Sequence, residues 1–254
     1  MTSNLATSRR AAVDAFLERN RQVLAAGRGR GRLIFALDAT QSRQPTWDVA
    51  CQIQGEMFQA VGAIGLDIQL IYFRGLNECR ASQWVSNGKI LADLMSRIDC
   101  RTGKTQIDKV LSHALRECEQ QKVHALAFVG DAMEESIDQL CKIAGELGMR
   151  GIRVFLFQEG VDAAATSAFR EIARLTKGAH CHFSPGAPQE LAELLRAVAA
   201  YAAGGLKALS ASQSAGAVKL LQQLKSPRLI SHTERRWGRG ALWAAGVARY
   251  FAGR

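Results

Sequence analysis

The chain has 254 residues, a formal net charge of +10 and six cysteines. A chain of this length can bury a large core without disulfides or structural metals. No apolar run approaches the roughly eighteen residues of a transmembrane helix. The cysteines contain no C-x-x-C pair, and the start of the chain lacks the apolar core of a secretory signal. We therefore expect a reduced, cytoplasmic protein.

The positive charge is concentrated at the two ends of the chain. Residues 1–32 carry seven basic and two acidic side chains, a net charge of +5, and residues 205–254 carry nine and one, a net charge of +8. The segment 33–204 has 17 basic and 20 acidic side chains and a net charge of −3. The basic composition therefore does not indicate a nucleic-acid-binding core.

Strands and helices alternate along the middle of the chain. An amphipathic helix is expected over 9–25, before a glycine-rich stretch. We predict strands at 32–38, 67–74, 123–130, 152–157 and 180–183, an antiparallel edge strand at 78–84, and helices at 46–64, 88–98, 106–120, 134–148, 163–177 and 188–203. The continuous apolar runs in these strands suit a sheet that is covered on both faces. The pattern predicts an α/β fold with a doubly wound, mostly parallel sheet, one antiparallel edge strand and helices on both faces.

Composition divides the chain into three parts. Residues 1–31 form a basic helical flank with a Gly/Arg linker, residues 32–204 form the α/β domain, and residues 205–254 form a basic helical tail. The pair Gly204–Gly205 is a helix stop signal and marks the expected boundary. One further helical segment is expected between this pair and Pro227.

Oxygen-bearing side chains follow the predicted strands at the points where each ends. Asp38, Thr40 and Ser42 occupy alternate positions after the first strand, Thr105 precedes the helix at 106–120, and Asp131 follows the strand at 123–130. Ligands in open α/β sheets bind beyond the carboxyl ends of the strands, where such loops converge. Carboxylate and hydroxyl oxygens are the ligands that hard divalent cations prefer.

This arrangement resembles the metal-ion-dependent adhesion site of von Willebrand factor A domains, over roughly residues 32–204. Among these domains, the chain resembles the intracellular bacterial type. The resemblance implies that the five residues hold Mg²⁺ or Mn²⁺. It also implies an open coordination position for an Asp or Glu of a protein partner. Thr40 keeps the hydroxyl of the more usual serine, whereas Lys104 and Ala132 depart from the family's pattern. The alternative is that Asp38 and Asp131 only cap helices or hydrogen-bond loops.

No catalytic constellation stands out, and we do not expect an enzyme. The segment 103–105 lacks the glycine that a phosphate-binding loop requires at position 98. His180 and His182 fit a strand at the edge of the sheet, because nothing nearby in sequence completes a zinc site. Glu134 and Glu135 are expected in the first turn of the following helix, where they complement its dipole.

The last twenty residues combine arginines with an apolar stripe. The residues that form this candidate interaction segment are Arg235, Arg236, Arg239, Trp243, Tyr250 and Phe251. A basic amphipathic helix of this kind docks on a protein partner, lies on an anionic membrane surface or packs on its own domain. The leading interpretation is a metal-dependent protein-interaction module that acts as a scaffold or adaptor. The alternatives are a nucleic-acid-associated protein with basic ends and a structural central domain and, less favoured, a metal-dependent hydrolase.

Overall fold

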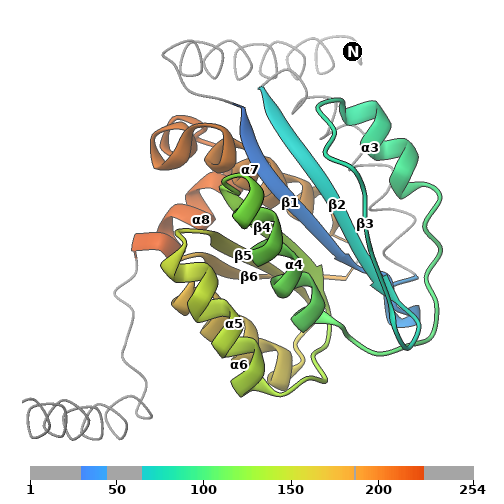
Figure 1. The fold of residues 1–254 in the computed structure, drawn as a ribbon. Coiled ribbons are helices and arrows are strands. Elements are labelled where there is room, and N and C mark those ends of the chain that lie inside the picture. Colours follow the sequence, from blue (N-terminus) through green and yellow to red (C-terminus); the bar gives the residue numbers. More distant parts are fainter. Residues whose placement is uncertain (1–29, 45–64, 186, 226–254) are drawn as a thin grey trace, which may run out of the picture. The chain divides into compact units, whose positions relative to one another are not determined.

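The computed structural model describes residues 30–44, 65–185 and 187–225 (Figure 1). Within them, six strands form one sheet: β1 (Gly31–Asp38), β2 (Leu66–Arg74), β3 (Glu78–Ala81), β4 (Ala125–Gly130), β5 (Arg153–Glu159) and β6 (Ala179–Phe183). Their order across the sheet is β3-β2-β1-β4-β5-β6, and only the pair β2–β3 is antiparallel. The predicted sheet, with its antiparallel edge strand, is confirmed.

Helices cover both faces of this sheet (Figure 1). Two clusters of buried apolar side chains form the core. The first includes side chains of α3 (Gly88–Met95), α7 (Pro188–Ala211) and α8 (Ala215–Lys225). The second includes side chains of α4 (Ile107–Gln120), α5 (Ile137–Met149) and α6 (Ala163–Leu175). A short 3₁₀ helix, η1 (Gln41–Arg43), follows β1. The expected doubly wound arrangement is therefore present in the described residues.

The central strand β1 explains why both layers form. Leu33, Phe35 and Leu37 contribute to the first core cluster. Ile34 and Ala36 contribute to the second. Successive side chains of a strand point to opposite faces, so a strand buried on both sides needs an uninterrupted apolar sequence. Each large side chain buried in this way stabilises the fold by about 1.5–3 kcal/mol.

The packed unit extends further toward the carboxyl end than we expected. The pair Gly204–Gly205 interrupts the helical backbone of α7, and Gly205 has a φ of +67°. The chain nevertheless continues into the core, where Leu209 and Leu220 are fully buried. A Cβ at Gly216 would lie 2.2 Å from the carbonyl oxygen of Glu193, so the backbone of α8 lies directly against α7. The compact unit therefore ends at Leu224 rather than at the glycine pair.

Several expectations lie outside the described residues. These are the helices at 9–25 and 46–64 and the candidate interaction segment, Arg235, Arg236, Arg239, Trp243, Tyr250 and Phe251. Among the helices that the structure describes, none is long and apolar enough to cross a membrane.

Candidate metal-binding site

The two aspartates of the predicted site lie side by side at the carboxyl edge of the sheet. β1 ends at Asp38, and the pairing of Leu37 with Val129 places Asp38 beside the end of β4, where Gly130 precedes Asp131. A Cβ at Gly130 would lie 3.5 Å from the Cβ of Asp38. The aspartate side chain therefore packs against the backbone that leads into Asp131.

The first loop brings its three oxygen-bearing side chains together. The buried Asp38 accepts a hydrogen bond at Oδ1 from the backbone N–H of Thr40, at 2.8 Å. The hydroxyls of Thr40 and Ser42 are 3.2 Å apart. The 3₁₀ turn, in which the Arg43 N–H donates to the Thr40 carbonyl at 3.0 Å, folds the chain so that these alternate side chains meet. Thr40 is buried and Ser42 is exposed, so the cluster reaches from the core to the solvent.

Two carboxylate oxygens at this edge have no hydrogen-bond partner among the described residues. They are Asp38 Oδ2 and Asp131 Oδ1, and both are buried. A buried acceptor without a partner costs about 1–3 kcal/mol. Burial raises the pKa of Asp38 to about 6; hydrogen bonds from Thr40 oppose the rise, and the nearby Asp131 charge adds to it. These oxygens fit a hard cation, which prefers carboxylate and hydroxyl ligands.

The third loop joins the site through the segment that follows β4. The buried Thr105 accepts a hydrogen bond at its hydroxyl from the Glu134 N–H, at 2.9 Å, and donates one to the Glu135 carboxylate, at 2.6 Å. Its own N–H donates to Glu134 Oε2 at 3.0 Å. A hydroxyl has two acceptor lone pairs. Thr105 therefore keeps one acceptor lone pair, and its loop is held against the segment that follows Asp131.

The expectation for Glu134 and Glu135 is wrong in its location. α5 begins at Ile137, with Ser136 as its N-cap, so both glutamates precede the helix. The Glu135 carboxylate instead accepts a hydrogen bond from the N–H of Ile107, the first residue of α4. The first N–H groups of a helix have no partner within it, and negative charge there complements the helix dipole. Glu134 and Glu135 therefore stabilise the start of α4 and the Thr105 loop.

The two departures from the family's pattern are compatible with the loops that carry them. The Lys104 side chain is exposed, and its backbone N–H donates to the Gly75 carbonyl at 3.1 Å. Among the described non-glycine residues, a positive φ occurs only at Lys177 and Gln213. Ala132 therefore needs none of the left-handed backbone that would favour glycine.

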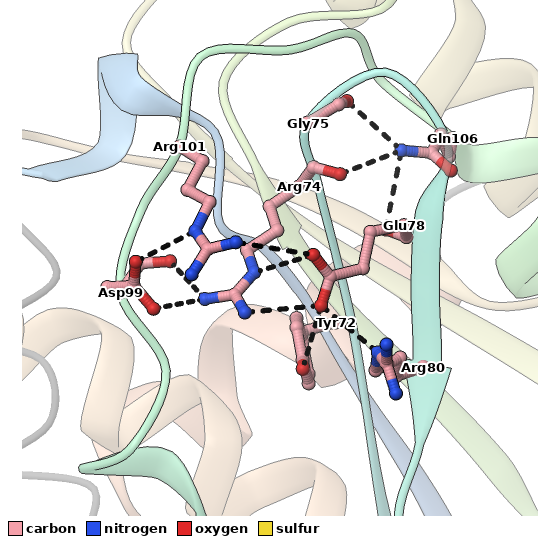
Figure 2. A network of polar contacts seen from close by, with 8 residues as sticks. All are labelled: Tyr72, Arg74, Gly75, Glu78, Arg80, Asp99, Arg101 and Gln106. Carbon is pink, nitrogen blue, oxygen red and sulfur yellow. Dashed lines mark hydrogen bonds and ion pairs between the residues drawn. The ribbon is translucent and has the colours of Figure 1, made fainter.

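The turn between β2 and β3 holds the side chain of Gln106, the residue that follows Thr105, as Figure 2 shows. The Gln106 side-chain amide donates to the carbonyls of Arg74, Gly75 and Glu78 at 3.3, 3.3 and 3.4 Å. A Cβ at Gly103 would lie 2.0 Å from the Gly75 carbonyl oxygen. Only glycine allows the loop backbone to approach the hairpin turn this closely.

An ion network links the same hairpin to the first site loop (Figure 2). Arg74 binds both carboxylate oxygens of Glu78, at 3.1 and 3.2 Å, and the Asp99 carbonyl at 2.9 Å. Arg101 pairs with Asp99 at 2.9 Å. The backbone N–H of Arg101 donates to the Ala39 carbonyl at 3.0 Å. This network could not be predicted from the sequence, because its members lie in segments that we expected to be loops or strand ends.

A buried charge pair beside the aspartates was also not predicted from the sequence. Arg43 is 2% exposed and forms an ion pair with Glu159 at the end of β5. Burial lowers the pKa of the Arg43 guanidinium, whereas the charges of Asp131 and Asp38 raise it. Two features of the sequence could have indicated this pair: an arginine directly after Ser42, and an acidic residue where a neighbouring strand ends.

Each of the two histidines of β6 has a polar partner on a neighbouring segment of the chain. His180 Nε2 lies 3.0 Å from Gln158 Oε1, and His182 Nδ1 lies 3.0 Å from the Gly160 carbonyl. Burial lowers the pKa of His180 to about 4, and the charge of His182 lowers it further. Within the part of the chain that the structure describes, no three His, Cys, Asp or Glu side chains gather as a metal-binding group. A cation at the candidate site would therefore depend on hydroxyl oxygens as well as carboxylates.

Comparison with known proteins gives structural likeness only. No protein-family model and no curated protein matches the chain. Among solved structures, a von Willebrand factor type A protein from Catenulispora acidiphila matches with a TM-score of 0.55 and 15% identity, over 69% of this chain and 43% of that one. Proximal thread matrix protein 1 from the mussel byssus matches with a TM-score of 0.53 and 15% identity, over 69% and 46%.

The match to a third solved structure covers the whole length of that structure. An aerotolerance-related membrane protein from Bacteroides fragilis matches with a TM-score of 0.50 and 15% identity, over 78% of this chain and all of that one. The chain spans less than half of the other two structures. The strand order, the antiparallel edge strand and these likenesses show that the chain has the fold of a von Willebrand factor A domain.

Proposed function

We propose that the domain is a protein-interaction module that binds its partner through a divalent cation, Mg²⁺ or Mn²⁺. The residues that would hold the cation are Asp38, Thr40, Ser42, Thr105 and Asp131. The observation that carries the proposal is the pair of buried oxygens, Asp38 Oδ2 and Asp131 Oδ1, which lack a partner in the described residues. They lie on adjacent strands at the edge of the sheet where ligands of such folds bind.

Each residue has a distinct part in this proposal. Asp38 and Asp131 supply the negative charge, and the bond from the Thr40 N–H fixes the orientation of the Asp38 carboxylate. Thr40 and Ser42 supply hydroxyl oxygens from one turn, and Thr105 supplies one from the opposite loop. When bound, the cation would attract an acidic group of the partner to the solvent side, where Ser42 is exposed.

A thermal titration tests the metal part of the proposal. Mg²⁺ or Mn²⁺ at about a hundred times its Kd should raise the melting temperature by roughly 5–10 °C, because a ligand that binds only the folded state stabilises it by mass action. Asp131→Ala should abolish this rise, while Asp93→Ala, at an exposed position of α3, should preserve it. A wild-type melting curve that does not respond to either metal would contradict the proposal.

Capture experiments test the interaction part. Proteins that the wild-type chain retains in Mg²⁺ should be released by chelator and should not be retained by Ser42→Ala. Ser96→Ala is the matched control, because Ser96 is an exposed residue at the C-cap of α3, and its hydroxyl donates to the Asp93 carbonyl at 3.0 Å. Partners that remain bound in excess chelator would place the interface elsewhere.

A further inference from the structure

The side chain of Arg43 reaches the ends of strands β5 and β6. Its backbone follows the Ser42 turn beyond β1, whereas its partner Glu159 is the last residue of β5. Its guanidinium carbon also lies 5.9 Å from the centre of the Phe183 ring, at the end of β6. β4 lies between β1 and β5, so the pair connects the turn after β1 with the end of a strand two positions along the sheet.

The strand register places the partner of Arg43 beside the site. Gly130 pairs with Gln158, so Glu159 lies next to the position where Asp131 leaves β4. The charges of Asp131 and Asp38 both act on the Arg43 guanidinium. Asp38, Asp131, Arg43 and Glu159 therefore form one charged cluster at the carboxyl edge.

A buried arginine in this place works against a metal. Its guanidinium stays protonated in proteins, and its side chain here is only 2% exposed, so water screens it little. Beside two aspartates it would leave a formal charge of −1, which is too little to balance a divalent cation. Glu159, whose side chain is 7% exposed, restores the formal charge to −2.

We propose that Glu159 is a positioning residue for the cation site: by pairing with Arg43 it holds that charge away from the metal, so that Asp38 and Asp131 keep two negative charges for a divalent cation. This inference rests on the proposed function. It adds to the five candidate ligands a pair of residues that tunes their affinity without contacting the metal.

Four proteins test the charge balance: the wild type, Arg43→Met, Glu159→Gln and the double variant. The formal charges of the four-residue cluster are −2, −3, −1 and −2 in that order, from two aspartates with or without each partner. We expect Glu159→Gln to weaken Mn²⁺ binding by about ten-fold or more and Arg43→Met to strengthen it by a similar factor, because an added unit charge acts across a poorly screened interior. The double variant should bind within about three-fold of the wild type.

The measurement is isothermal titration calorimetry with Mn²⁺ alone, on the full chain, with folding verified by circular dichroism. Glu171→Gln is the matched control, because it breaks a partly exposed Glu–Arg pair in the second half of α6, at 2.6 Å, and should leave Mn²⁺ binding unchanged. If Glu159→Gln does not fold, the other three proteins carry the same test. Arg43→Met should bind Mn²⁺ more tightly than the double variant, and the double variant should bind Mn²⁺ as tightly as the wild type.

The outcomes separate this inference from the proposed function. A wild type that binds Mn²⁺ together with a Glu159→Gln variant of equal affinity would overturn the inference and leave the proposed function intact. A wild type that binds none, with binding gained in Arg43→Met, would show that Arg43 takes the place of the cation, which overturns both. A wild type and an Arg43→Met variant that both fail to bind would refute the metal site itself, and the inference with it.

Discussion

Two groups of charged residues flank the candidate site, and they differ in burial. On one side, the hairpin network of Arg74, Glu78, Asp99 and Arg101 reaches the solvent: the side chains of Asp99 and Arg101 are 60% and 55% exposed. On the other side, the pair Arg43–Glu159 is enclosed by the ends of β5 and β6. Water and salt screen the first group, whereas they screen the buried pair much less. Similar chemistry therefore supports a loop on one side and sets the charge of the site on the other.

The largest expected effect comes from breaking the buried pair. Glu159→Gln should lower the free energy of unfolding by about 3–5 kcal/mol, because it removes the buried carboxylate that pairs with the Arg43 guanidinium. The double variant with Arg43→Met should recover most of this loss, since it removes both charges together. Urea denaturation in chelator measures both values. A Glu159→Gln variant that is as stable as the wild type would show that the pair is not buried in solution.

The next effect concerns the pH dependence of the metal-free protein. The pKa of Asp38 is raised by burial from 3.8 to about 6. A carboxyl with a raised folded-state pKa contributes stability that is complete below its unfolded pKa and is lost as the pH rises through the folded value. The wild type should therefore lose about 2–2.5 kcal/mol from this group between pH 4 and pH 7.

Asp38→Asn provides the comparison for that titration. The variant should lack this component of the pH dependence, whereas Asp93→Asn, at an exposed position, should behave like the wild type. Mn²⁺ should become more stabilising over the same range, because metal binding requires the deprotonated carboxylate. Parallel pH profiles of chemical denaturation for the wild type and Asp38→Asn would contradict the assignment.

The smallest effect is expected in the hairpin network. Glu78→Gln should cost about 1 kcal/mol or less, because the Glu78 side chain is partly exposed and Arg74 keeps its pair with Asp99. This loss should shrink as salt is raised, whereas the loss in Glu159→Gln should change little. Denaturation in low and high NaCl measures both. An equal salt dependence for the two variants would remove the contrast between the two sides of the site.

Much of the fold could be predicted from the sequence because local patterns decide it. β1 and β4 each contain an uninterrupted apolar run, at 33–37 and 125–129, and such runs form strands that are covered on both faces. Alternating strands and helices then require a mostly parallel sheet whose carboxyl ends share an edge. The placement of Asp38 beside the end of β4 follows from this topology.

The extent of the packed unit was not predictable in the same way. A glycine pair interrupts the helix at Gly204–Gly205, and local sequence cannot distinguish a kink from a domain boundary. What decides it is whether the following segment finds an apolar surface. Leu209 and Leu220 do so, and the missing side chain of Gly216 lets α8 lie against α7.

The sequence by itself determined which side chains could bind a cation, since residue type and position after a strand fix the available oxygens. Only the tertiary structure decided what surrounds them. Thr105 bonds to Glu135 thirty residues away, and Arg43 pairs with Glu159 across an intervening strand. No periodic pattern in the sequence predicts either pairing, because each depends on strand order and on the register in which β4 and β5 align. The charge that a metal would meet at this edge is therefore a property of the folded sheet.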